Sequence, residues 1–202
     1  MTPLQPQDLR QFADVLRLRS GAAMTVRFVE PADVNVLHRY FDALSVRTHY
    51  SRFLGATRDV PQSEYTRMLR TGQGSHFAVV AEVDAGDAKT IVGEARYALD
   101  PETHSVEFGI SVADDWHGQG AGSALLTNLE CRAAALGAER IFGDALNTNQ
   151  EMRALARRRG YHFTHPPGDW TLVRFEKDVR IAQDIPCVQS STLVQKFSSM
   201  WW

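Results

Sequence analysis

The stretch Val112-Ala-Asp-Asp-Trp-His-Gly-Gln-Gly-Ala-Gly-Ser-Ala-Leu-Leu126 places three alternate glycines between an apolar run typical of a strand and one typical of a helix. The glycines at 118, 120 and 122 allow a sharp turn and let a ligand come close to the backbone. The unpaired N–H groups and the positive end of the following helix would face an anion. The sequence therefore predicts an anion-binding loop between a strand and a helix.

Glycine spacing narrows the choice of anion. The spacing G-x-G-x-G differs from the G-x-G-x-x-G of dinucleotide folds, and the loop has no Lys followed by Ser or Thr, as a triphosphate-binding loop would. From the loop alone, a glycine-rich turn that only ends a helix stays open as an alternative.

Together with its flanking segments, the loop resembles the acyl-CoA-binding half of the GCN5-related N-acetyltransferase (GNAT) superfamily. The pattern Arg/Gln-x-x-Gly-x-Gly/Ala of that superfamily is matched at His117, Gly120 and Gly122, with His in place of the first residue. A second landmark is an Asn followed by a helix that ends in Gly-Phe or Gly-Tyr, and Asn149 and Gly160-Tyr161 match it.

The upstream sequence resembles the acetyltransferase domain of bacterial Pat-type protein-lysine acetyltransferases. The resemblance is carried by Ser45-Val-Arg-Thr-His-Tyr-Ser-Arg-Phe-Leu54, by residues 63–69 and by Ile91-Val-Gly-Glu-Ala-Arg-Tyr97, and it covers residues 25–176. It implies a mixed α/β (α+β) GNAT fold, in which a mostly antiparallel central sheet is flanked by helices and two splayed strands hold acyl-CoA. The chain would be a stand-alone catalytic domain.

The resemblance also implies a set of cofactor contacts. Acetyl-CoA would be the co-substrate, with a backbone N–H near residues 110–112 donating to the thioester oxygen. The implied binding residues are Ile110, Val112, His117, Gly118, Gln119, Gly120, Ala121, Gly122, Ser123 and Asn149. For Asn149, ordinary capping of a helix is an equal alternative to a contact with the pantetheine arm.

Acetyl transfer to an amine needs a base, because a lysine ammonium with a pKa of about 10.4 is protonated at neutral pH. In the family a Glu in the strand before the loop fills this role, and Glu107 matches its position. The alternative is an exposed strand residue or a partner of Arg96 across the hairpin. The usual general acid of the family, a Tyr, is replaced by Ala156, which a good thiolate leaving group would tolerate.

Length, composition and charge exclude several classes of protein. A length of 202 residues with 44% hydrophobic residues fits one soluble domain. A net charge of −2 and a pI near 6.4 give no reason to expect nucleic acid as a partner. No apolar run is long enough to span a membrane, and the two cysteines have no zinc or disulfide spacing, so the reducing cytoplasm is the expected location. No metal is expected, because His162 and His165 would point to opposite faces.

The predicted organisation has three parts. They are an N-terminal extension over 1–23 with a helix at 8–19, the GNAT domain over 24–179, and a tail over 180–202. The extension could also pack only weakly. The tail, with Trp201 and Trp202 as anchors, would be mobile or would cover a neighbouring copy in a homo-oligomer.

Within the domain, hydrophobic periodicity and turn residues predict the order of elements. Helices are expected from Pro31 to Ser45, at 46–53 and at 121–136, and in the segment 147–161; strands are expected at 25–29, 76–83, 90–99, 104–112, 140–146 and 170–176. Gly109 would mark a bulge or a close approach. Asp114 and Asp115 are expected to cap the turn of the loop.

The predicted function is transfer of an acetyl group from acetyl-CoA to a primary amine, with a protein lysine as the preferred acceptor. Two alternatives stay open. One is a small amine as acceptor (a polyamine, an amino acid or an antibiotic), and the other is a non-catalytic CoA-binding sensor or partner subunit. The triplet Arg157-Arg-Arg159 is expected to be a solvated helix end, although one of its members could meet a CoA phosphate.

Overall fold

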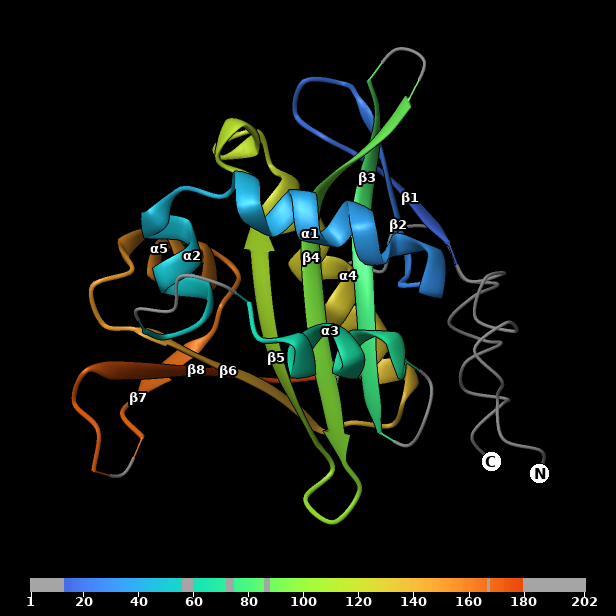
Figure 1. The fold of residues 1–202 in the computed structure, drawn as a ribbon. Helices are drawn as coiled ribbons and strands as arrows, with labels where there is room; N and C mark the ends of the chain where they lie inside the picture. The colour runs from blue at the N-terminus through green and yellow to red at the C-terminus, as the bar shows by residue number, and fades with distance from the viewer. Residues whose placement is uncertain (1–12, 56–59, 72–74, 86–87, 167, 180–202) are drawn as a thin grey trace, which may run out of the picture.

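The computed structural model describes residues 13–55, 60–71, 75–85, 88–166 and 168–179. These residues form an eight-stranded sheet in the order β1-β2-β3-β4-β5-β6-β8-β7 (Figure 1). The strands are β1 (Asp14–Arg17), β2 (Ala23–Phe28), β3 (His76–Ala85), β4 (Ala88–Asp100), β5 (Ser105–Val112), β6 (Arg140–Leu146), β7 (His162–Thr164) and β8 (Leu172–Asp178). Only β5 and β6 pair in parallel, so the predicted mixed, mostly antiparallel sheet is confirmed.

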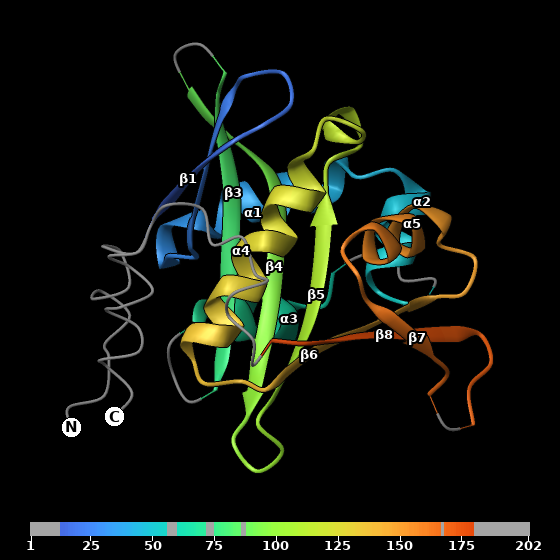
Figure 2. The same cartoon turned by 180° about the vertical axis from the view of Figure 1, so that it is seen from behind.

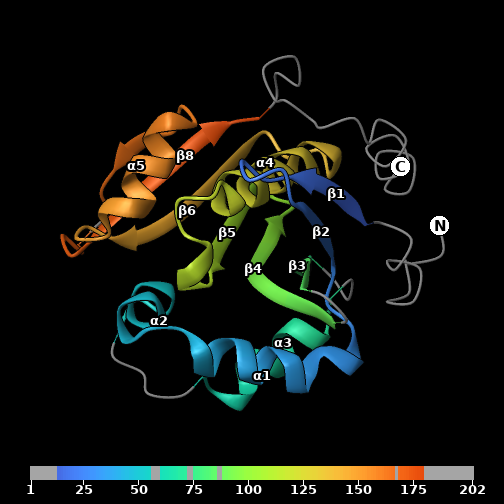
Figure 3. The same ribbon diagram turned by 90° about the horizontal axis from the view of Figure 1, so that it is seen from above.

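Helices cover both faces of the sheet. They are α1 (Val34–Ala43), α2 (Val46–Arg52), α3 (Gln62–Leu69), α4 (Ala121–Ala135) and α5 (Gln150–Arg158), with short 3-10 turns η2 (Pro31–Asp33) and η3 (Asp114–Trp116). Seen from above, α1, α2 and α3 lie on one side, and α4 lies on the other (Figure 3). The view from behind shows α4 along β4 and β5, with α5 beside the β6–β8 end of the sheet (Figure 2). None of the described helices is long and apolar enough to cross a membrane.

The two covered faces explain why β3 is nearly all apolar. Phe77, Val79 and Ala81 belong to the core under α4, whereas Ala78 and Val80 belong to the core under α1 and α3. Because side chains alternate between the faces of a strand, a central strand with a helix layer on each side must be apolar at every position.

The N-terminal prediction is wrong where the structure tests it. Residues 14–17 form β1, which pairs antiparallel with β2, and do not form a helix; residues 1–12 lie outside the described part. Burial alternates along β1, with Asp14 and Leu16 inside and Val15 and Arg17 outside. A period of two is that of a strand. The helix was predicted instead from the helical spacing of Leu9, Phe12 and Leu16.

A buried polar contact fixes β1 to α4. Asp14 Oδ2 accepts hydrogen bonds from Asn128 Nδ2 at 2.6 Å and from Arg132 Nη2 at 2.7 Å. Arg132 is 4% exposed, and its guanidinium lies 4.5 Å from the centre of the Phe28 ring. The hairpin of β1 and β2 is therefore part of the folded domain and does not pack only weakly.

Other predicted elements need smaller corrections. The strand predicted at 170–176 begins at Leu172 and ends at Asp178. Gly109 lies in a regular stretch of the β4–β5 register, and the bulge is at Ala81 and Glu82 instead. Cys131 is disulfide-bonded, contrary to the expectation drawn from the spacing of the two cysteines. The other cysteine, Cys187, and the tail with its two tryptophans lie outside the described residues.

Asp14→Ala should lower the free energy of unfolding by about 3–5 kcal/mol, because it leaves the buried Arg132 without this carboxylate. Asp42→Ala is the control, since Asp42 is exposed on α1. Urea denaturation of the two variants measures the difference. Equal stabilities would show that this ion pair does not anchor the N-terminal hairpin.

Candidate active site

The central feature of the site is the divergence of β5 from β6. The two strands pair only from Ser105 and Arg140 to Glu107 and Phe142, after which β6 continues in register with β8. Gly143 lies where they part. A Cβ at this position would be 2.9 Å from the carbonyl oxygen of Phe108 and 3.0 Å from the ring of Phe175.

The divergence leaves one edge of β5 without a strand partner. The carbonyl oxygens of His104 and Phe108 face β6, the first accepting from the N–H of Glu139 at 2.7 Å. Because backbone groups alternate in direction along a strand, those of Ile110 and Val112 face the same gap. The Val112 oxygen is occupied by Nε2 of His117 at 2.9 Å. The N–H of Ile110 is thus directed into the opening.

The glycine-rich loop, residues 117–122, ends in the first turn of α4. Gly118 and Gly120 have φ values of 72° and 97°, a region that non-glycine residues rarely adopt. Gly120 is the N-cap of α4, and no side-chain hydrogen bond caps the helix. The N–H groups of the first turn are therefore free of a capping side chain, as an anion-binding helix end requires.

The strand gap and the loop open into one cleft of about 920 Å³. Nine of the predicted site residues line it: Glu107, Ile110, Val112, His117, Gly118, Gly120, Gly122, Ser123 and Asn149. Two do not. Gln119 donates from Nε2 to the carbonyl oxygen of Asp115, and the side chain of Ala121 is buried in the core.

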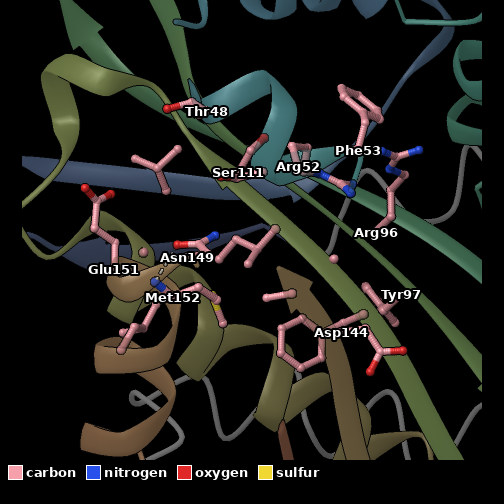
Figure 4. Close-up of a pocket in the computed structure, with 18 of the residues that line it drawn as sticks. Thr48, Arg52, Phe53, Arg96, Tyr97, Ser111, Asp144, Asn149, Glu151 and Met152 are labelled. Atoms are coloured by element: carbon pink, nitrogen blue, oxygen red, sulfur yellow. Dashed lines mark hydrogen bonds between the residues drawn. The ribbon is translucent and has the colours of Figure 1, made fainter. Parts of the chain in front are cut away.

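Two helices form the walls of the cleft (Figure 4). Figure 4 shows Thr48 and Arg52 of α2 on one side and Asn149, Glu151 and Met152 of α5 on the other. Asn149 caps α5, since its Oδ1 accepts from the N–H of Met152 at 3.0 Å. The capping interpretation of this residue is therefore confirmed, and its side-chain NH₂ group is left as a donor.

An ionic bridge crosses the mouth of the cleft. The carboxylate of Glu151 lies 3.1 Å from Nη2 of Arg47 and 3.4 Å from Nδ1 of His117. It thereby connects α2, α5 and the glycine-rich loop. Because Glu151 and Arg47 are both well exposed, we attribute little stability to the bridge.

Beneath α2 lies a buried charge network centred on Glu94. The carboxylate accepts hydrogen bonds from Arg52 and, at 2.9 Å, from Ser111 Oγ, which also contacts the hydroxyl of Tyr40. Nε of Arg96 lies 3.6 Å from Oε2 of Glu94. Burial opposes ionisation of Glu94, but the charges of the two arginines and these hydrogen bonds outweigh it, so its pKa lies below the ordinary 4.5.

The same network explains why residue 109 is a glycine. A Cβ at this position would be 2.8 Å from Nη1 of Arg52, so the guanidinium lies directly over the glycine. The close approach predicted for Gly109 comes from this side chain and not from backbone. Phe53 packs beneath Arg52 and Arg96, at 5.5 and 5.6 Å from ring centre to guanidinium carbon, which agrees with the core role expected for it.

Asp114 has a role other than the one expected. Its carboxylate does not cap the turn of the loop but accepts hydrogen bonds from the N–H and Oγ of Ser45 and from Oγ1 of Thr48. Burial opposes its ionisation, yet these hydrogen bonds outweigh burial and lower its pKa. The contact ties the start of α2 to the loop.

Four carboxylates line the cleft, and three of them are engaged. Glu64 pairs with Arg96 and Arg67, Asp144 receives two hydrogen bonds from Arg174 at 2.8 and 2.7 Å, and Glu151 forms the mouth bridge. Glu107 is exposed and, among the described residues, makes no hydrogen bond or ion pair. It does not pair with Arg96, since Ala98 lies opposite it in the register.

Helix α5 presents no tyrosine to the cleft. Ala156 is fully buried and does not line the cleft, where Met152 and Leu155 face it instead. Tyr161 is a core residue, as predicted, at 4% exposure. Within the described part of the chain, no three metal-ligating side chains come together.

Sequence reasoning missed several residues of the cleft. They include Arg19, Arg47, Glu64, Asp144 and Glu151, whereas Arg158 belongs to the triplet for which the sequence leaves a phosphate contact open. All come from elements far apart in the chain, which local periodicity does not connect. One signal was available for the buried network: charged Glu94 and Arg96 in an otherwise apolar strand indicate partners inside the protein.

Comparison with known proteins agrees with this geometry. The model of the acetyltransferase (GNAT) family matches residues 43–161. An acetyltransferase of Pseudomonas aeruginosa is 26% identical over 156 residues, which cover 77% of this chain and 84% of the relative. Acetyltransferase Pat of Mycolicibacterium smegmatis is 26% identical over 172 residues, or 85% of this chain, but this chain spans only 50% of that protein.

Solved structures show the same fold. The GNAT domain of S. lividans PAT superposes with a TM-score of 0.74 at 21% identity, covering 82% of this chain and 96% of that one. RimL, a ribosomal L7/L12 α-N-protein acetyltransferase solved with coenzyme A, gives a TM-score of 0.61 at 17% identity over 82% of this chain and 98% of its own. The family model and the related acetyltransferases make the protein an acyltransferase. The chain belongs to the GNAT acetyltransferase family, because the family model matches more than half of it.

Gly143→Ala should destabilise the protein by about 1–3 kcal/mol and weaken ligand binding in the cleft, because the added methyl collides with β5 and Phe175. Gly55→Ala is the control, since the nearest atom to its added Cβ is 3.9 Å away. Thermal unfolding and acetyl-CoA titration test the pair. If Gly143→Ala behaved like Gly55→Ala, the close approach at Gly143 would not set the strand divergence.

Glu94→Gln should cost about 3–5 kcal/mol at neutral pH, because Arg52 and Arg96 lose their buried counter-charge. The folded-state pKa of Glu94 is lowered, so its stabilisation is complete above pH 4.5 and is lost as the pH falls through the lowered value. The gap between native chain and variant should therefore narrow in acid. Urea titrations across this range measure it, with the exposed Glu102→Gln as control; a pH-independent gap would contradict the expectation.

Proposed function

We propose that the protein transfers the acetyl group of acetyl-CoA to a primary amine and that its preferred acceptor is a lysine of a protein. Membership of the GNAT family gives the acyltransferase class. Two similarities support a protein acceptor. One is the similarity to Pat. The other is the fold shared with RimL, which is named as an acetyltransferase of a ribosomal protein.

The cleft fits acetyl-CoA. The pantetheine arm can lie along the unpaired edge of β5, where the N–H groups of Ile110 and Val112 have no strand partner among the described residues. The uncapped first turn of α4 offers N–H groups to the pyrophosphate. The NH₂ group of Asn149 is available to a carbonyl of the arm.

We assign the general base to Glu107. The single observation that carries this assignment is that Glu107 alone, among the cleft carboxylates of the described residues, has no ion pair or hydrogen bond. A carboxylate already held by an arginine is less available to accept a proton, because its oxygens are occupied by hydrogen bonds. Glu107 also lies where the strands begin to part, at the closed end of the opening.

In the proposed reaction, Glu107 accepts a proton from the acceptor ammonium, directly or through a water. The freed amine nitrogen forms a bond to the thioester carbonyl carbon, and the N–H of Ile110 stabilises the negative charge on the oxygen. The bond from carbon to sulfur then breaks, the nitrogen gives its second proton to solvent, and coenzyme A leaves as a thiolate. Because the thiol has a pKa of about 8.5, the thiolate can leave without the tyrosine that Ala156 replaces.

Glu107→Gln should lower kcat by about 10²- to 10⁴-fold, because the amide cannot accept the proton, while the affinity for acetyl-CoA stays unchanged. The measurements are release of the CoA thiol in the presence of a lysine peptide and calorimetric titration with acetyl-CoA. Glu176→Gln is the matched control, since Glu176 lies in the same sheet on β8, opposite Phe142, and does not line the cleft.

The outcomes separate the three candidate functions. Turnover with the lysine peptide that Glu107→Gln abolishes supports the proposal. Turnover with spermidine or an amino acid, and none with the peptide, would favour the small-amine acceptor. Tight acetyl-CoA binding without turnover on any amine would favour a CoA-binding sensor or partner subunit.

A further inference from the structure

Several carboxylates lie near the glycine-rich loop, although the ligand expected there is an anion. Asp114 and Asp115 lie in the 3-10 turn just before the loop, and Glu151 of α5 lies 3.4 Å from its His117. A pyrophosphate bound at the start of α4 would thus lie near these acidic residues, of which Glu151 pairs with Arg47 and Asp114 accepts hydrogen bonds from Ser45 and Thr48. The partial positive charge of a helix end is about half an elementary charge, too little to balance a pyrophosphate. Further cations near the loop would be needed for tight binding.

Arg19 supplies one such cation from the β1–β2 connection. Its N–H donates to the carbonyl oxygen of Gln119 at 3.1 Å, and its Cγ lies 3.3 Å from the position of a Cβ on Gly120. Figures 2 and 3 show this connection beside the loop that leads into α4. The side chain is exposed, lines the cleft and has no ion-pair partner among the described residues.

Arg158 supplies a second cation from α5. Leu155 packs against Gly122, with its Cδ2 3.5 Å from the position of a Cβ there, and Arg158 lies on the same helix face one turn further on. It is exposed, lines the cleft and likewise has no ion-pair partner in the described part of the chain. Its neighbours serve other purposes, since Arg157 stacks on Phe163 and Arg159 pairs with the buried Glu130.

The two arginines approach the start of α4 from different sides. Arg19 lies against Gly120, the N-cap of α4, whereas α5 packs through Leu155 against Gly122 in the first turn. Along α5 the order runs from Asn149, beside the proposed pantetheine site, to Leu155 at the loop and then to Arg158. Arg158 therefore lies toward the adenosine end of a bound coenzyme A.

We propose that Arg19 and Arg158 form a two-sided phosphate clamp, in which Arg19 binds the pyrophosphate of coenzyme A and Arg158 binds its 3′-phosphate. The inference rests on the proposed acetyl-CoA site. It makes the N-terminal hairpin part of that site, although Arg19 lies outside the residues 43–161 that match the family model. A guanidinium suits this role because it remains charged and can donate two parallel hydrogen bonds to a phosphate.

Calorimetric titration of the full chain with CoA and with 3′-dephospho-CoA tests the clamp. Arg19→Ala should bind both ligands about tenfold more weakly than the native chain. Arg158→Ala should lose about tenfold for CoA but bind 3′-dephospho-CoA as the native chain does. Both losses should shrink at high salt, because the side chains are exposed.

Matched controls come from the same two elements. Arg17→Ala lies in the same hairpin, where its side chain bonds the carbonyl oxygen of Gly21, and Arg157→Ala lies in the same turn of α5. Both should bind CoA as the native chain does. If Arg19→Ala and Arg158→Ala also did so, the clamp would be excluded. Failure of the native chain to bind CoA would instead overturn the proposed function itself.

Discussion

The rest of the site depends on the parting of β5 from β6 after their short parallel register. A parallel pair that continued would satisfy the backbone of both strands and leave no room for a ligand. Here β6 takes β8 as its partner, and Gly143 allows the close contact with Phe108 and Phe175 from which the strands diverge. The result is an edge of β5 whose N–H and C=O groups can bind an extended ligand as a strand would.

The opening must be held in shape although it interrupts the sheet. On one side, the buried network around Glu94 connects α2 to β4 and β5, so the α2 wall of the cleft rests on charge pairs that are costly to break. Asp114 adds a link from the start of α2 to the glycine-rich loop. On the other side, α5 packs through Leu155 on Gly122. These contacts place the loop, the strand edge and the free carboxylate of Glu107 around one cavity.

The N-terminal hairpin shows how a segment outside the matched family region can enter the site. Asp14 anchors β1 to α4 through Asn128 and Arg132, which fixes the following turn next to the helix start. Arg19 therefore meets the glycine-rich loop as a consequence of packing at the other end of the hairpin. The stability of the fold and the charge at the proposed phosphate site are connected through this one element.

The sequence by itself determined the fold class, the glycine-rich loop and most of the residues that line the cleft around it, because these features are contiguous in the chain and their backbone needs are local. It also located β5, α4 and β6, whose hydrophobic periods are strong. It misjudged residues 14–17, where four residues are too few for a period to be decisive. Only the tertiary structure decided which carboxylates of the cleft are paired and which is free, and which arginine of residues 157–159 faces the site. Those outcomes depend on partners such as Arg174, Arg47 and Glu130, which lie far away in the chain and which only packing brings into contact.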